Sequence, residues 1–130
     1  MKKKIPRYKA WDKKTKTLSY VTAILISNNL IITADGSSSA DDMILMEYTG
    51  FTDKDGEEAT EFSILETDES LGGENGVIEK INGVFMLVLP ELLLPLHTLF
   101  PTDFRIVGNA FQHSYLLDDE IWRDFENEGN

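Results

Sequence analysis

The chain has 130 residues, enough for one domain, and its apolar content of 42% supports a buried core. It contains no cysteine, which excludes disulfides and thiol chemistry and fits a reducing cytosol. The first lysines lead into Ile5-Pro6-Arg7-Tyr8 rather than into an apolar run, so no signal peptide is expected.

Charge is unevenly distributed along the chain. Residues 1–16 hold eight basic residues against Asp12 alone, a net charge of +7, whereas residues 17–130 hold four basic residues against 22 acidic ones, a net charge of −18. A basic arm on an acidic body indicates self-complementarity, with the arm lying on its own body or on a neighbouring subunit, or else contact with nucleic acid. The acidic remainder would repel phosphate, so nucleic acid is the less favoured partner.

The first half of the chain reads as strands joined by turns. Residues 18–26 predict a strand, Asn28-Asn29 a turn, and residues 30–34 a strand that pairs back. The Asp, Ser and Gly residues of 35–42 predict a polar loop, which is followed by another strand over 43–50.

The stretch TGFTDKDGEE (49–58) has the residue types of a calcium loop, but not the spacing. With Gly56 at the sixth position of an EF-hand loop, the first and twelfth positions fall on Phe51 and Phe62, which cannot bind an ion. Asp55-Gly56 lies between two β-prone segments and is a pair favoured where a hairpin needs positive φ. We therefore predict a hairpin turn here and no metal site.

Further strands are predicted over 60–67, 76–81 and 84–89, with a loop over 68–76. Asn82-Gly83 between the last two is the strongest hairpin signal in the chain.

Residues 84–100 are rich in leucine, but Pro90, Glu91, Pro95 and His97 interrupt them, and a membrane helix needs about 20 clean apolar residues. No membrane span is predicted, and a helical signal is limited to about 90–100 and 116–126. The leucines belong either to the core or to a subunit interface, because exposed apolar patches usually mark contacts. The candidate interface residues here are Leu92, Leu94, Leu96 and Phe100.

The end of the chain predicts a strand over 104–111 and a short helix over about 116–126. Leu117, Ile121, Trp122 and Phe125 fall on one face of that helix. The helix packs on its own domain or docks on a partner, and in the second case Trp122 and Phe125 join the candidate interface.

Signatures of catalysis are thin. His97 and His113 lie sixteen residues apart without paired ligand spacing, and neither a nucleophile elbow nor a phosphate loop occurs. Carboxylates are abundant, but their spacing singles out no pair. We expect no catalytic residue, no cofactor and no metal site.

Four stretches in order carry a family resemblance. They are Lys9-Ala10-Trp11-Asp12, Leu45-Met46-Glu47-Tyr48-Thr49-Gly50, Asp55-Gly56 and Ile106-Val107-Gly108-Asn109. Together they resemble the YopX family of phage and prophage proteins of Gram-positive bacteria, over most of residues 4–117. One departure is that the family usually has Gly-Asp where this chain has Phe62-Ser63, which puts the local bend in question. The resemblance implies a mainly β protein in the cytoplasm of the bacterial host that assembles as an oligomer. It implies no activity.

The sequence thus predicts a single mainly β domain over 1–130. It has an N-terminal β portion (1–50), a small barrel-like portion (51–115) and the C-terminal helix. The favoured function is that of a non-enzymatic accessory protein that contacts itself, as a homo-oligomer with a two-fold contact, or a host protein. The alternatives are an acidic inhibitor that mimics DNA toward a host nucleic-acid-binding factor, and a hydrolase with a carboxylate or metal site.

Overall fold

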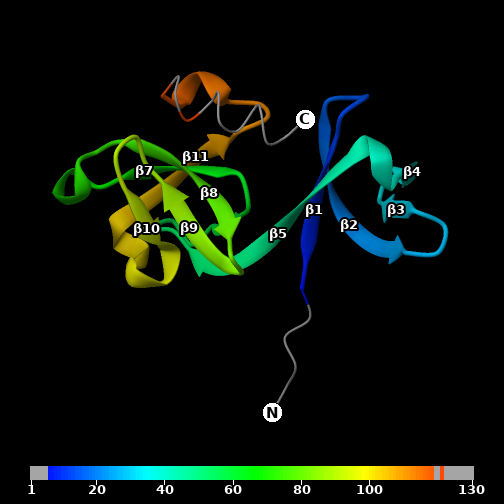
Figure 1. Ribbon diagram of the computed structural model, residues 1–130, viewed down its shortest axis with the longest axis horizontal. Helices are drawn as coiled ribbons and strands as arrows, with labels where there is room; N and C mark the ends of the chain where they lie inside the picture. Colours follow the sequence, from blue (N-terminus) through cyan, green and yellow to red (C-terminus); the bar gives the residue numbers. More distant parts are fainter. Residues whose placement is uncertain (1–5, 119–120, 122–130) are drawn as a thin grey trace, which may run out of the picture. The chain divides into compact units, whose positions relative to one another are not determined.

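The chain folds into two antiparallel sheets, whose strands are connected by short turns (Figure 1). The structure is a computed structural model and describes residues 6–118 and 121. The chain consists of two compact units: unit 1 is Met1–Tyr48 and unit 2 is Thr49–Asn130. The prediction of a mainly β protein is confirmed. Within the described residues, no helix is long and apolar enough to cross a membrane.

Unit 1 is built from strands that pair in the order β4-β3-β2-β1-β5. Strand β5 begins in unit 1 and runs on into unit 2. The strands are β1 (Tyr8–Asp12), β2 (Thr17–Leu25), β3 (Leu30–Thr33), β4 (Gly36–Ser39) and β5 (Met43–Thr52), with a 3-10 turn at Ala40–Asp42.

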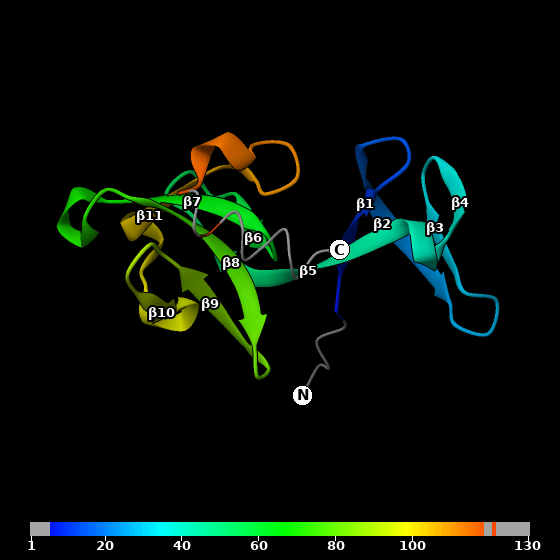
Figure 2. The ribbon, with the colours of Figure 1, turned by 45° about the horizontal axis from the view of Figure 1, so that its top comes forward.

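Unit 2 contains a five-stranded antiparallel sheet in the order β10-β9-β8-β7-β11, and β6 pairs with β5. Figure 2 shows the β8–β9 hairpin. The strands are β6 (Glu58–Thr60), β7 (Ser63–Thr67), β8 (Asn75–Ile81), β9 (Val84–Val88), β10 (Leu93–Pro95) and β11 (Phe104–Asn109). Short 3-10 turns lie at Glu69–Leu71, Leu96–Thr98, Pro101–Asp103 and Ser114–Leu116.

The predicted hairpin turns are confirmed. Asn82 and Gly83 link β8 to β9 with φ of 50° and 81°, the two positive values that a type I′ turn requires. Asn29, with φ 53°, closes the turn between β2 and β3. Gly56, with φ 83°, donates its N–H to the Asp53 carbonyl (3.0 Å) between β5 and β6. The stretch 49–58 is therefore a hairpin, as predicted.

Three local predictions are wrong, and one strand was not predicted. The basic arm contains this unpredicted strand, β1, which lies between β2 and β5 in the sheet and buries Ala10 and Trp11. The predicted loop 35–42 holds β4 and a 3-10 turn, since the hydroxyl-rich strand β4 needs no apolar face at the sheet edge. The expected helical segment 90–100 is instead β10 followed by a 3-10 turn, because Pro95 cannot supply a helical N–H.

The third correction concerns the strand predicted over 60–67, which breaks at Phe62 into β6 and β7. Phe62 has φ 66°, the left-handed conformation that a glycine adopts without strain. The Ser63 hydroxyl accepts a hydrogen bond from Thr60 N (3.0 Å), and the Phe62 ring packs edge-on against Phe111 at 5.5 Å. The bend is therefore kept although the family's Gly-Asp pair is missing.

Among the described residues, unit 2 contains two clusters of buried apolar side chains. One gathers around Leu65, Ile78, Leu87, Leu96 and Phe104, all with at most 1% of their surface exposed. The other gathers Ile64, Val77, Ala110, Leu117 and Ile121. Most of the predicted C-terminal helix lies outside the described residues.

Candidate interface surfaces

The predicted interface segment divides into inward and outward side chains. Leu96 is fully buried in the unit 2 core, and Leu94 packs half-buried against the same cluster. Leu92 and Phe100 stay 52% and 72% exposed, and so does Leu93, at 53%, which sequence reasoning had not singled out. Trp122 and Phe125 lie outside the described residues. We call residues 92–100, with Leu92, Leu93 and Phe100 at the surface, the 92–100 segment.

The backbone explains this division. Strand β10 lies at the edge of its sheet and pairs with β9 (Leu93 opposite Val88), so successive side chains point to opposite faces, and Leu94 points inward. The Pro95 carbonyl accepts a hydrogen bond from Thr98 Oγ1 (2.7 Å), and Phe100 N donates to Asp103 Oδ2 (2.7 Å). These bonds shape the turns that bring Leu96 into the core and leave Phe100 in solvent.

A second surface, in unit 1, combines cations with aromatic rings. The Arg7 guanidinium lies over the Tyr48 ring at 4.8 Å, and Lys9 Nζ lies 5.3 Å from the Tyr20 ring and 5.7 Å from that of Tyr48. The two tyrosine rings are parallel within 2°, with centroids 6.5 Å apart. We call these four residues the basic–aromatic strip.

Strand register assembles this strip from three segments. Lys9 of β1 is opposite Tyr20 of β2, and the Tyr48 N–H of β5 donates to the Arg7 carbonyl (2.9 Å). Since side chains alternate along a strand, Arg7 and Lys9 point to the same face of β1. Each cation–π contact at an exposed site is worth about 0.5–1 kcal/mol, and the Tyr20 ring remains 64% exposed. Only the basic half of this strip was visible in the sequence.

A polar groove of about 460 Å³ also opens in unit 1. The groove is lined by two carboxylates, five hydroxyl-bearing side chains and one methionine. These are Asp12 and Asp35; Thr15, Thr17, Ser19, Thr33 and Ser38; and Met43. The Ser19 hydroxyl donates to Asp35 Oδ2 (2.7 Å), and Thr15 and Thr17 share a hydrogen bond of 2.7 Å. The lining groups thus bond largely to one another.

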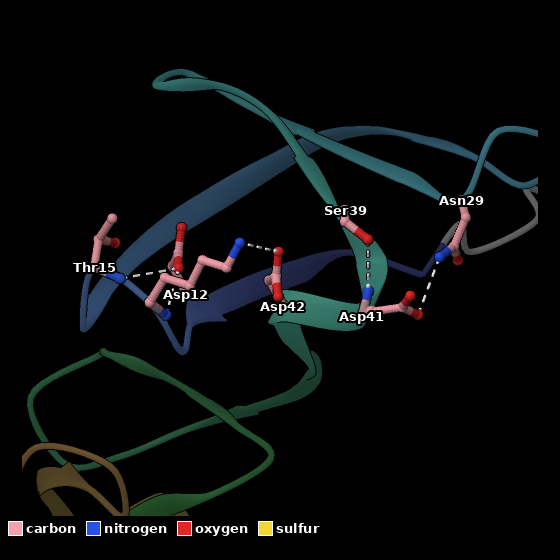
Figure 3. A network of polar contacts seen from close by, with 7 residues as sticks. Asp12, Thr15, Asn29, Ser39, Asp41 and Asp42 are labelled. Carbon is pink, nitrogen blue, oxygen red and sulfur yellow. Dashed lines mark hydrogen bonds and ion pairs between the residues drawn. The ribbon is translucent and has the colours of Figure 1, made fainter.

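The Asp12 carboxylate closes the turn between β1 and β2. Its Oδ1 accepts hydrogen bonds from the N–H groups of Lys14 (2.8 Å) and Thr15 (3.1 Å), as Figure 3 shows. The bond from Thr15 N–H is the main reason why the pKa of Asp12 is lowered. This carboxylate therefore stabilises the turn.

Two neighbouring carboxylates in Figure 3, those of Asp41 and Asp42, also make contacts that stabilise the fold. Lys14 Nζ pairs with Asp42 Oδ2 at 3.1 Å, and Asn29 Nδ2 donates to Asp41 Oδ1 at 3.1 Å. Ser39 Oγ accepts from Asp41 N (3.2 Å) and caps the 3-10 turn. These contacts connect the β1–β2 turn, the β2–β3 turn and the end of β4 to the 3-10 turn before β5.

In unit 2, Asp53 occupies the place where the sequence suggested a calcium ligand. It is buried, with 3% of its surface exposed. Its Oδ1 accepts from Asp55 N and Glu57 N and its Oδ2 from Ile106 N, all at 2.9 Å. Burial by itself raises the pKa of Asp53, but these N–H groups and the nearby Arg105 charge outweigh it, and the pKa is lowered. Both oxygens bond to backbone, which ties the turn to β11.

The histidines remain apart. His97 is exposed, whereas His113 is half-buried and its Nδ1 accepts a hydrogen bond from Asn109 N (3.1 Å). Among the described residues, no group of three or more histidine, aspartate or glutamate side chains is placed to hold a metal ion.

Comparisons with known proteins agree with this architecture. The model of the family described as YopX protein matches residues 7–118. A crystal structure of protein EF1440 from Enterococcus faecalis is similar, with a TM-score of 0.68 and 22% identity, over 88% of this chain and 99% of that one. The X-ray structure of protein yopX from Bacillus subtilis has a TM-score of 0.56 and 16% identity, over 86% of this chain and 98% of that one. None of the curated proteins compared with the chain matches it.

Proposed function

The chain belongs to the YopX family, and from that premise we propose that it is a non-enzymatic phage or prophage accessory protein that acts through protein contacts as a homo-oligomer. Its setting is the cytoplasm of the bacterial host, and a host protein is a further partner. The observation that carries the proposal is the exposure of Leu92, Leu93 and Phe100 on one short segment of unit 2.

The exposure matters because these side chains are large, close in sequence and placed by ordered turns. Full burial of such a side chain is worth roughly 1.5–3 kcal/mol relative to full exposure. Three large exposed apolar side chains within nine residues make this segment a candidate contact site, because exposed apolar surface often marks contacts. Pro95 on the edge strand β10 removes one ladder N–H, so we expect the contact to be made by side chains rather than by pairing of sheet edges.

Light scattering at micromolar concentration tests the proposal. We expect the wild-type chain to show a multiple of 14.7 kDa and the double variant Leu92→Ser/Phe100→Ser to show the mass of one chain. A matched control is Ile81→Ser/Val84→Ser, because these side chains are also apolar, exposed (39% and 40%) and in unit 2. The control should keep the wild-type mass. A wild-type protein with the mass of one chain would overturn the proposal.

A further inference from the structure

The 92–100 segment alone does not account for association at micromolar concentration. Micromolar affinity needs a net free energy of about −8 kcal/mol, and association first costs an estimated 4–15 kcal/mol in lost freedom. Three side chains that are already 28–48% covered contribute roughly half of their full burial value. The surface that faces this segment must therefore contribute binding free energy of its own. That surface is either the same segment of another copy or a different surface of that copy.

We propose that the 92–100 segment of one copy packs on the basic–aromatic strip of a second copy. The contact is then heterologous, with a different surface on each side, and not the two-fold contact that is commonest among oligomers. This inference rests on the proposed self-association and specifies its geometry.

Charge is the first argument. Residues 49–130 hold four basic and 18 acidic residues, a net charge of −14, whereas residues 1–48 hold eight basic and five acidic ones, a net charge of +3. A two-fold contact through the 92–100 segment brings two units of −14 together. The heterologous contact instead brings unit 2 of one copy, with a net charge of −14, against unit 1 of another copy, with a net charge of +3. Like charges facing each other across an interface are unfavourable and unlike charges attract.

The local sequence sharpens this argument. The exposed Glu91 directly precedes Leu92, and no lysine or arginine occurs between positions 81 and 104. Two copies of the segment facing each other therefore have no basic side chain of their own beside these glutamates. On the strip, Lys9 and the exposed Arg7 supply cations.

The chemistry of the strip is the second argument. Tyrosine and arginine are enriched at the energetic centres of protein interfaces, since they join a large apolar surface to a polar end. The Tyr20 ring is the exposed apolar element that Leu92, Leu93 and Phe100 require. The parallel rings of Tyr20 and Tyr48 also hold the Lys9 side chain, so less conformational freedom is lost on binding.

Mixing two variants distinguishes the geometries. The strip variant is Lys9→Glu/Tyr20→Ala, and the segment variant is Leu92→Ser/Phe100→Ser. In a heterologous contact each variant alone has the mass of one chain, but an equimolar mixture doubles that mass, because one intact strip meets one intact segment. The control Lys80→Glu/Tyr115→Ala removes a lysine that lies over Phe85 at 5.3 Å and a tyrosine that is 78% exposed, both in unit 2. It should retain the wild-type mass.

Several outcomes overturn the inference. A strip variant that still forms the wild-type oligomer shows that the proposed function holds and the heterologous contact does not. A mixture that stays at the mass of one chain also rejects it. A monomeric wild type rejects the proposed function itself, so the two failures are distinguishable. Circular dichroism establishes that each variant is folded. If the strip variant is not folded, Tyr20→Ser alone replaces it, with an expected loss of affinity of about tenfold or more.

Discussion

Unit 1 and unit 2 are both antiparallel, but they bury apolar side chains very differently. Both clusters of buried side chains described above belong entirely to unit 2. Among the described residues, the buried apolar side chains of unit 1 are Ala10, Trp11, Ile31 and Met46. Unit 1 also exposes Tyr20 in β2, Ile24 and Leu25 at the end of the same strand, and Ile26 in the β2–β3 turn.

This difference predicts which unit is the more stable one and which unit has side chains available for binding. Apolar burial is the main favourable term in folding, so unit 2 should be the more stable unit. Unit 1 has 48 residues and relies more on strand pairing and on the polar contacts around Asp12, Asp41 and Asp42. Its exposed aromatic and aliphatic side chains are available for binding. The predictions below test this contrast, from the largest expected effect to the smallest.

Phe104→Ala should have the largest effect. The side chain is 1% exposed in the first core cluster of unit 2, and truncation of a buried phenylalanine costs about 3–5 kcal/mol. Urea denaturation monitored by circular dichroism measures the loss. The matched control is Phe100→Ala, four positions earlier and 72% exposed, which should change the stability of the single chain by about 0.5 kcal/mol or less.

The same experiment on unit 1 decides whether the contrast is real. Met46 is 1% exposed, but it is not part of either core cluster. Met46→Ala should cost about 2 kcal/mol, the lower end of the range for a buried methionine, because the surroundings can collapse more easily. If Met46→Ala costs as much as Phe104→Ala, unit 1 has a core of equal quality and the comparison fails.

Asp53→Asn should have the next largest effect, about 1–3 kcal/mol. One carboxylate oxygen is replaced by an amide NH₂, which faces an N–H donor whichever way the amide turns. The pKa of Asp53 is lowered below 3.8 in the folded state, so its contribution is complete above the unfolded pKa and is lost as pH falls through the folded one.

Denaturation at pH 7 and at pH values below 4 measures both effects. The wild type should lose stability over this acid range, and Asp53→Asn should lose less of it, since an amide does not titrate. The control is Asp55→Asn, whose side chain is exposed and pairs with Arg105 at the surface (3.2 Å); it should cost well under 1 kcal/mol. Equal acid sensitivity of Asp53→Asn and the wild type would contradict the prediction.

Substitutions of Phe62 should have a smaller effect on stability, and the smaller residue, glycine, should be the less damaging one. Phe62→Ala loses the contact with Phe111 and keeps the left-handed strain, whereas Phe62→Gly loses the same contact and relieves the strain. We expect Phe62→Gly to be more stable than Phe62→Ala by about 1 kcal/mol in urea denaturation. The opposite order would show that the backbone at position 62 does not hold this conformation in solution.

The sequence predicts much of this fold where the signals are local. Asn82-Gly83 needs only two residues to specify positive φ, and apolar β-prone segments flank it, so the hairpin could be placed from the sequence. Strand β1 was missed because five of the first nine residues are basic, and its apolar pair Ala10-Trp11 is too short to show a period. Only pairing on both sides, with β2 and β5, makes this segment a strand.

The candidate surfaces divide in the same way. Leucine excess pointed to 92–100, but composition could not tell that Leu93 stays outside while Leu96 enters the core. The first depends on the register of β10 against β9, and the second on the 3-10 turn that follows β10. The basic–aromatic strip joins residues 7, 9, 20 and 48, which only strand pairing brings together. Sites made of residues distant in the chain have no local spacing from which they could be predicted.

The smallest expected effect belongs to the tip of the β2–β3 hairpin in unit 1. Ile26 is 89% exposed, so Ile26→Ser should change the stability of the single chain by no more than about 0.5 kcal/mol. Ile31 in the same hairpin is 1% exposed, and Ile31→Ala should cost about 2 kcal/mol or more. Thermal unfolding of both variants at two protein concentrations measures the difference. A cost of 1 kcal/mol or more for Ile26→Ser, growing with concentration, would mean that the tip is covered in the oligomer. The apolar surface of unit 1 would then extend the proposed contact beyond the strip.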